Sequence, residues 1–184
     1  MTQFIPKHGG FRKLFSYQKA EIIYDATVYF TNRFFRKGDR TIDQMVQAAR
    51  SGKQNIAEAS LASATSKETE IKLTNVARAS QVELLIDYQD FLRTNKLTEW
   101  PLDHAYAKRL RELHKLPDPT YENYRQGIEH SDPSICANVV IGLIKVTCYL
   151  LERQIDFLEQ DFIKNGGIKE RMTKARLSNR KKDT

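Results

Sequence analysis

The chain has 184 residues, of which 40% are hydrophobic, and it carries a formal net charge of +7. This length fits one domain with its own core, and the few glycines and the near absence of alternating apolar and polar runs favour an all-α fold over one with strands. The longest apolar run, residues 139–151, contains Lys145 and is too short to cross a bilayer, and residues 1–10 lack the apolar stretch of a signal peptide. We therefore expect a cytoplasmic protein with no membrane partner.

The first predicted helix runs from about residue 12 to residue 35, after a flexible N-terminal lead over residues 1–10. Its apolar side chains cover a wider arc than one core requires, so we expect part of this helix to contact another subunit. A turn follows at residues 36–40, where Gly38 suits the end of one helix and Asp39 the start of the next. The same turn holds three cations, Arg36, Lys37 and Arg40.

Two long helical patterns occupy residues 39–92 and are separated by a short run of small and polar residues. Thr65 and Glu68 have the spacing of a capping box at the start of the second pattern, and Ser66 is a rival N-cap. Because the connection is short, we expect these two helices to pack antiparallel. The second of them is predicted to stop at Trp100-Pro101.

Polar residues accompany the apolar stripes of both patterns, at Asn55 and Glu58 in the first and at Ser80 and Glu83 in the second. One interpretation is a structural polar clamp that forms hydrogen bonds across the helix pair and fixes its register. The other is a carboxylate pair, Glu58 with Glu83, for acid–base or metal chemistry. Metal sites in helical bundles typically use Glu-x-x-His, which the chain lacks, so the clamp is favoured and neither a metal nor a cofactor is expected.

The region after residue 101 begins with a predicted short amphipathic helix at 102–116, whose inward residues are expected to be Leu102, Tyr106, Leu110 and Leu113. Residues 120–131 interleave aromatic and cationic side chains, which either stack nucleobases or, more commonly, pack on the core. Asp132 and Pro133 predict the start of a last long helix, which ends near residue 164. For the tail, a basic helix and a disordered arm are both open.

Two segments of the long patterns carry a family resemblance: Gln44, Ala48-Ala49, Ser51 and Asn55-Ile56-Ala57-Glu58 in the first, and Ala77-Arg78-Ala79-Ser80 with Glu83 in the second. On these residues the chain resembles, over roughly 11–100, the bacterial four-helix-bundle family first noted as proteins encoded in intervening sequences of 23S ribosomal RNA genes. The accessory variability protein of diversity-generating retroelements is related to that family.

That resemblance implies an antiparallel up-and-down four-helix bundle. It also implies a ring-like homo-oligomer, a pentamer, and nucleic-acid binding as in several members of the family. We therefore expect the bundle over residues 11–165. An extra short helix and its connections, residues 102–133, lie between the third and fourth bundle helices, and a basic tail follows at 166–184.

Positive charge is concentrated at both ends of the sequence. Eight Lys or Arg stand against two acidic residues from 164 onwards, and ten stand against four in residues 1–53. Such asymmetry favours a polyanionic partner, and phosphate contacts by Lys and Arg predict salt-sensitive, non-specific binding of RNA or DNA. The candidate contact residues are Arg36, Lys37, Arg40, Arg50, Lys53, Arg171, Lys174, Arg176, Arg180, Lys181 and Lys182.

Catalytic signatures are absent from the sequence, which has no Gly-x-Ser-x-Gly, His-Glu-x-x-His or Cys-x-x-Cys. We therefore expect a non-enzymatic oligomer that binds nucleic acid. The alternative function is a protein-binding scaffold or accessory subunit for a nucleic-acid enzyme such as a reverse transcriptase, by analogy with the retroelement relatives. A third interpretation is that the cations only keep the protein in solution.

Overall fold

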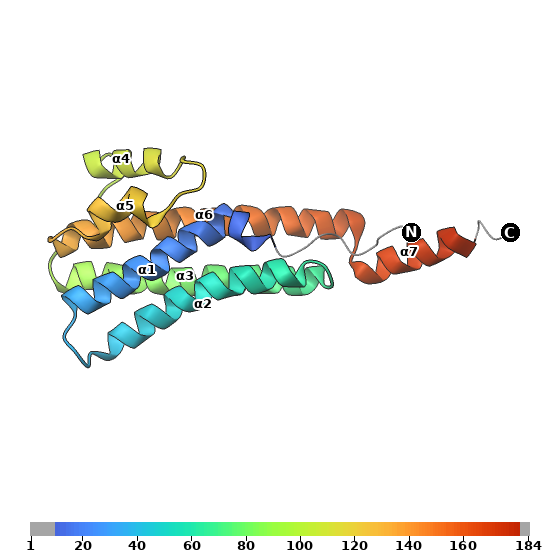
Figure 1. The fold of residues 1–184 in the computed structure, drawn as a ribbon, viewed down its shortest axis with the longest axis horizontal. Coiled ribbons are helices and arrows are strands. Elements are labelled where there is room, and N and C mark those ends of the chain that lie inside the picture. The colour runs from blue at the N-terminus through green and yellow to red at the C-terminus, as the bar shows by residue number, and fades with distance from the viewer. Residues whose placement is uncertain (1–9, 181–184) are drawn as a thin grey trace.

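The structure, a computed structural model, describes residues 10–180, and these residues are all-helical with no strand among them. The predicted all-α fold is therefore confirmed over this range. Figure 1 shows the elements in chain order. They are the 3-10 helix η1 (Phe11–Lys13) and the helices α1 (Phe15–Phe34), α2 (Arg40–Ala62), α3 (Lys67–Thr94), α4 (Ala105–Leu113), α5 (Tyr121–Ile128), α6 (Pro133–Asn165) and α7 (Ile168–Arg180).

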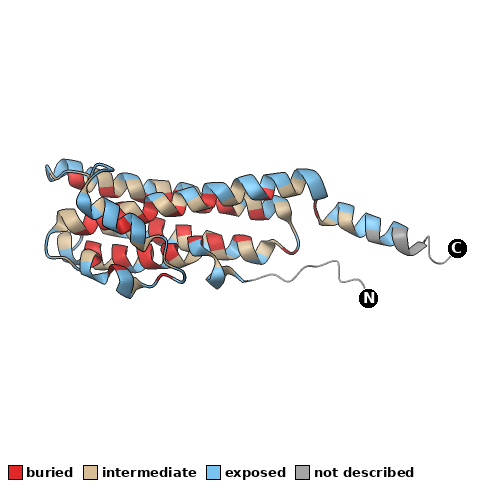
Figure 2. Cartoon of the chain, turned by 90° about the horizontal axis from the view of Figure 1, so that it is seen from above, coloured by how far each residue is buried: buried red, intermediate tan, exposed pale blue. Residues whose placement is uncertain are grey.

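Four long helices enclose the core. α1 contacts α2 and α6, and α3 contacts the same two helices, so each of the four has two long neighbours. The buried residues line their facing sides, as Figure 2 shows. At one end of the core, the fully buried Phe30 lies with its ring centroid 4.9 Å from Tyr88 and 4.8 Å from Phe91. Burial of such rings is the main favourable term that holds the helices together.

Side-chain caps define where three of the long helices begin. Asp39 and Asp132 accept hydrogen bonds from the backbone N–H groups of Thr41 and Ser134, at 2.9 and 2.8 Å, so both predicted starts are confirmed. For α3 the cap is Ser66, whose Oγ accepts from the backbone N–H of Thr69 at 3.1 Å. The predicted capping box of Thr65 and Glu68 is wrong because the extended backbone, at φ −149°, occurs at Ser66.

The region 102–133 contains two short helices, α4 and α5, where one was predicted. The second begins because Thr120 and Asn123 form a capping box. Leu102 does not point inward as predicted: it is 81% exposed, because α4 begins only at Ala105 and Leu102 lies in the turn before it. Tyr106 is 51% exposed and packs on Trp100 at the surface, so its prediction is also wrong. Leu110 is buried and Leu113 packs against the core, as predicted.

A buried lysine anchors the end of α4 to α1. The side chain of Lys19 is 2% exposed, and its Nζ donates to the carbonyl oxygen of His114, the residue that caps α4, at 3.3 Å. A cation at a helix C-terminus is favoured by the helix dipole. The ring of His114 lies in the same buried group, with Nδ1 3.2 Å from the hydroxyl of Tyr124.

This group makes stability depend on pH. Burial, together with the nearby charge of Lys19, lowers the pKa of His114 from 6.5 to about 4. The unfolded chain therefore binds this proton first as the pH falls, and stability is lost between about pH 6.5 and pH 4. After a discount for partial exposure, we expect a loss of about 2 kcal/mol, measured by urea unfolding across this range. His114→Asn should remove this component, and an unchanged pH profile in that variant would contradict the assignment.

Among the described residues, the segment Pro133–Lys174, which contains all of α6, is long and apolar enough to span a membrane by length and composition. In the most apolar stretch of this segment, 56% is buried against the rest of the chain, as in a helix that belongs to a protein core. Three large apolar side chains of α6 are nevertheless exposed: Tyr149, Phe157 and Ile163.

Candidate nucleic-acid interface

A positively charged site lies where the C-terminal ends of α1 and α3 meet. Phe35, which ends α1, has its ring centroid 5.4 Å from that of Phe91 in the last turn of α3. The connection to α2 passes through Gly38, whose φ of 90° favours glycine. This junction exposes five cations, which we call the cationic end: Arg33, Arg36, Lys37, Arg40 and Lys96.

The charge of the cationic end is only partly offset by nearby carboxylates. Within residues 10–180, none of its five members forms an ion pair, whereas other exposed cations do, such as Arg93 with Asp90 at 2.7 Å. Asp39 lies in the same turn, and the hydrogen bond that its carboxylate accepts from Thr41 lowers its pKa and keeps it ionised, so it caps α2 and offsets one of the five positive charges. Unpaired, exposed cations in one place are suited to contact phosphates.

The sequence alone does not indicate that two of these five cations, Arg33 and Lys96, belong to the site. Arg33 is in the last turn of α1 and Lys96 follows α3, so about sixty residues of chain separate them. Only the packing of the two helix ends brings them together. The available signal was weak: a cation beside a predicted helix end is common because it stabilises the helix dipole.

Arg50 and Lys53 lie further along α2. Arg50 is exposed and is ten residues from Arg40, about 15 Å along the helix axis. Lys53 is half-buried, with its Nζ 4.3 Å from the centroid of the Tyr24 ring in α1. Burial raises the pKa of Asp25, and the charge of Lys53 opposes that rise. Lys53 therefore takes part in packing α2 on α1, and Arg50 is the freer of the two.

The predicted tail cations lie at the opposite end of the molecule. Arg171, Lys174 and Arg176 are on α7, beyond the C-terminal end of α6, which is about 50 Å long. The length of α6 is several times the Debye length, which is about 10 Å at 0.1 M salt, so salt screens the charges at one end from those at the other. The structure thus divides the predicted basic surface into two parts within one chain. The side chain of Arg180 and the residues Lys181 and Lys182 lie outside the described part.

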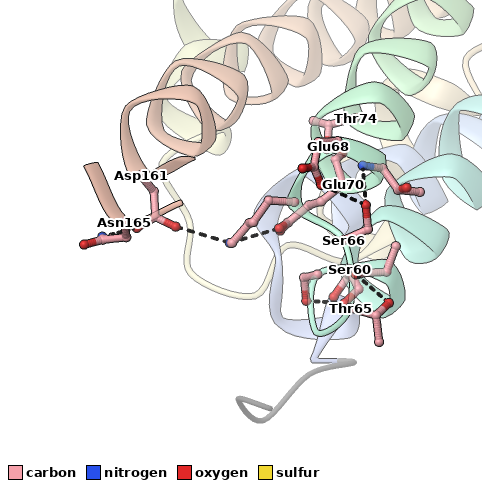
Figure 3. A network of polar contacts seen from close by, with 12 residues as sticks. Ser60, Thr65, Ser66, Glu68, Glu70, Thr74, Asp161 and Asn165 are labelled. Atoms are coloured by element: carbon pink, nitrogen blue, oxygen red, sulfur yellow. Dashed lines mark hydrogen bonds and ion pairs between the residues drawn. The ribbon is translucent and has the colours of Figure 1, made fainter. Parts of the chain in front are cut away.

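A polar network joins the start of α3 to the end of α6 near α7 (Figure 3). Lys67 Nζ lies 3.0 Å from Glu70 Oε2 and 3.4 Å from Asp161 Oδ2. A hydrogen bond from Asn165 lowers the pKa of Asp161, and Lys67 and Arg171 lower it further. Since Glu70 is only 7% exposed, Lys67 is the partner that makes its burial tolerable.

Removal of this partner is expected to destabilise the fold. Lys67→Met leaves the buried carboxylate of Glu70 without a cation and should lower the free energy of unfolding by about 2 kcal/mol in urea titrations. Lys115→Met is the matched control, because its pair with Glu112 is 71% exposed on both sides and should contribute less than about 0.5 kcal/mol. Equal losses in the two variants would show that burial of the pair is irrelevant.

The four residues proposed as a polar clamp separate into two groups. Ser80 Oγ lies 3.0 Å from Ser51 Oγ, and Asn55 Nδ2 donates to that same Ser51 oxygen at 3.2 Å, so Asn55 and Ser80 are linked across α2 and α3. Glu58 and Glu83 are exposed and form no hydrogen bond within the described residues. They point to solvent because the buried positions beside them are Ile56, Ala59 and Leu84. In residues 10–180 no cluster of His, Cys, Asp or Glu is suited to hold a metal ion.

Comparisons of the chain with protein-family models, with curated proteins and with solved structures find no match. The arrangement of its own residues therefore carries the functional argument.

Proposed function

We propose that this protein binds RNA or DNA non-specifically, with the cationic end as its primary contact surface. The observation that carries the proposal is the grouping of five exposed cations, none of them ion-paired within residues 10–180, at the junction of α1, α2 and α3. Binding of this kind gains affinity from counterion release and is strongly weakened by salt.

We further propose that α1, α2, α3 and α6 form an antiparallel up-and-down four-helix bundle that assembles into a homo-oligomer, a pentamer if it follows the family it resembles. The pairing of each long helix with two others supports the bundle. The exposed Tyr149, Phe157 and Ile163 on α6 support association, since apolar side chains of this size are commonly covered at subunit interfaces. In a ring, each cationic end is repeated, so weak phosphate contacts multiply.

Two measurements test these proposals. Fluorescence anisotropy with labelled RNA and labelled duplex DNA, over salt from about 50 to 200 mM, should give an affinity that falls linearly with salt on logarithmic axes. Absence of binding at the lowest salt would remove the nucleic-acid function. Native mass spectrometry or light scattering at micromolar concentration should give an oligomer, and a monomer would remove the association.

A further inference from the structure

A pocket of about 270 Å³ lies where α4 and α5 pack on α6. Its size is just below the range of pockets that hold drug-sized ligands, so it suits a ligand of the size of one nucleotide. One part of its wall is apolar and aromatic: Trp100, Tyr106, Leu110, Leu113, Ile135 and Val139. Another part is polar: Arg109, Asn123, Gln126 and His130.

The walls of this pocket are held firmly against the core. A Cβ on Gly127 of α5 would lie 2.8 Å from Val139, and one on Gly142 of α6 would lie 2.3 Å from Leu110, so both glycines permit a close approach. The backbone N–H of Trp100 donates to Asn138 Oδ1 of α6 at 2.7 Å. A site with fixed walls loses little entropy when a ligand binds.

The aromatic wall offers a surface for a planar ring. His104 stacks on Trp100 with ring planes 10° apart and centroids separated by 4.9 Å. His104 does not line the pocket, so the indole reaches it by its other face or its edge. Tyr106 adds a second ring, whose centroid is 5.4 Å from that of Trp100. Base–aromatic stacking is a principal means by which proteins hold unpaired bases.

The polar wall is rich in hydrogen-bond donors. Asn123 uses its Oδ1 to accept from the backbone N–H and the hydroxyl of Thr120, which leaves its amide N–H groups for a ligand. His130 Nδ1 accepts the backbone N–H of Asp132 at 3.0 Å, so the neutral ring carries its proton on Nε2 as a donor. Arg109 forms no ion pair within the described residues and adds a positive charge.

We propose that this pocket binds one nucleotide, with the base against Trp100 and Tyr106 and the phosphate on Arg109. A donor-rich wall with a guanidinium repels cations and gives no benefit to an aliphatic ligand, whereas a base edge with acceptors and a phosphate satisfies both parts of the site. Figure 1 shows α4 and α5 toward the same end of the long axis as the turn between α1 and α2, on the other side of the long helices. The site thus deepens the proposed nucleic-acid function and rests on it for the identity of the ligand.

Trp100 provides the test because it is the single tryptophan of the chain and lies in the pocket wall. Titration of the full chain with adenosine, guanosine, cytidine and uridine monophosphates should quench its fluorescence saturably with at least one of them. Arg109→Gln should weaken that binding about tenfold, the effect of one lost charge-assisted hydrogen bond. The corresponding nucleoside, which has no phosphate, should bind more weakly and should not respond to Arg109→Gln.

Lys108→Gln is the matched control, since it removes the same charge from a neighbouring exposed position of α4 that does not line the pocket. Absence of saturable quenching by all four mononucleotides at millimolar concentration overturns the site. Equal weakening by Arg109→Gln and Lys108→Gln overturns the role of Arg109.

Short single strands distinguish the source of the nucleotide. Quenching by a pentanucleotide as well as by mononucleotides identifies an unpaired base of a strand, and quenching by mononucleotides alone identifies a free nucleotide. The proposed pocket and the proposed nucleic-acid surface can be tested separately. The triple variant Arg36→Gln, Lys37→Gln, Arg40→Gln should weaken strand binding without changing mononucleotide binding. Mononucleotide binding without any strand or duplex binding would leave the pocket standing and remove the proposed function.

Discussion

Gly52→Val should lower the free energy of unfolding by about 3 kcal/mol, the top of the usual range for a single overpacking change. Gly52 lies on the face of α2 that contacts α3, where a Cβ would stand 2.2 Å from Nε2 and 3.0 Å from Cδ of Gln81. The Gln81 side chain is fully buried, so its amide has no solvent-filled space into which it can move. The added methyl groups must therefore push the Gln81 amide, which forms no hydrogen bond within the described residues, deeper into the core or move the two helices apart, which also disturbs the hydrogen bond between Ser51 and Ser80.

Two controls isolate this steric effect in urea unfolding. Gln54→Val introduces the same β-branched residue at an exposed position of α2 and should cost only about 0.5 kcal/mol through helix propensity. Gln81→Ala combined with Gly52→Val removes the colliding amide and should recover at least half of the loss, as a double-mutant cycle measures. Equal destabilisation by Gly52→Val and Gln54→Val would show that the helices do not approach closely here.

Local signals predicted the helix starts well because a cap depends on a few consecutive residues. Asp39 and Asp132 each bond to the backbone two residues later, and that relation is present in the sequence itself. The same locality explains the error at residues 102–116. Apolar periodicity placed Leu102 on an inward face, but the turn before α4 leaves that residue outside the helix.

Contacts between helices were less predictable because they depend on which faces meet. Asn55 and Ser80 are linked through Ser51 across α2 and α3, and the sequence pattern gives no sign that Ser51 takes part. The packing of Gln81 on Gly52 also gives no local signal. The cationic end is a similar case, since Arg33 and Lys96 belong to it only through the packing of α1 on α3. The other three cations, Arg36, Lys37 and Arg40, can be recognised from the sequence because they lie close together in one turn.

Loss of charge at that turn should have the largest effect on binding. The triple variant Arg36→Gln, Lys37→Gln, Arg40→Gln removes three exposed cations that form no ion pair in the described residues. If each contacts one phosphate of duplex DNA, the slope of log affinity against log salt should fall in magnitude by about 3, and affinity at 0.1 M salt by about a hundredfold. Fluorescence anisotropy over the same salt series measures both quantities.

The matched control is a triple variant that removes the same net charge but replaces only cations that form ion pairs. Arg153→Gln, Lys115→Gln and Arg125→Gln remove three cations away from the cationic end that are each paired with a carboxylate three residues away in the sequence. If local phosphate contacts determine binding, this second variant should retain most of the affinity and nearly all of the salt slope. If both triple variants lose affinity to the same extent, net charge alone attracts the nucleic acid, and the cationic end is not its binding surface. A salt slope that persists in the first variant would assign the remaining contacts either to Arg33 and Lys96 or to the α7 cations, which lie beyond the far end of α6, a helix about 50 Å long.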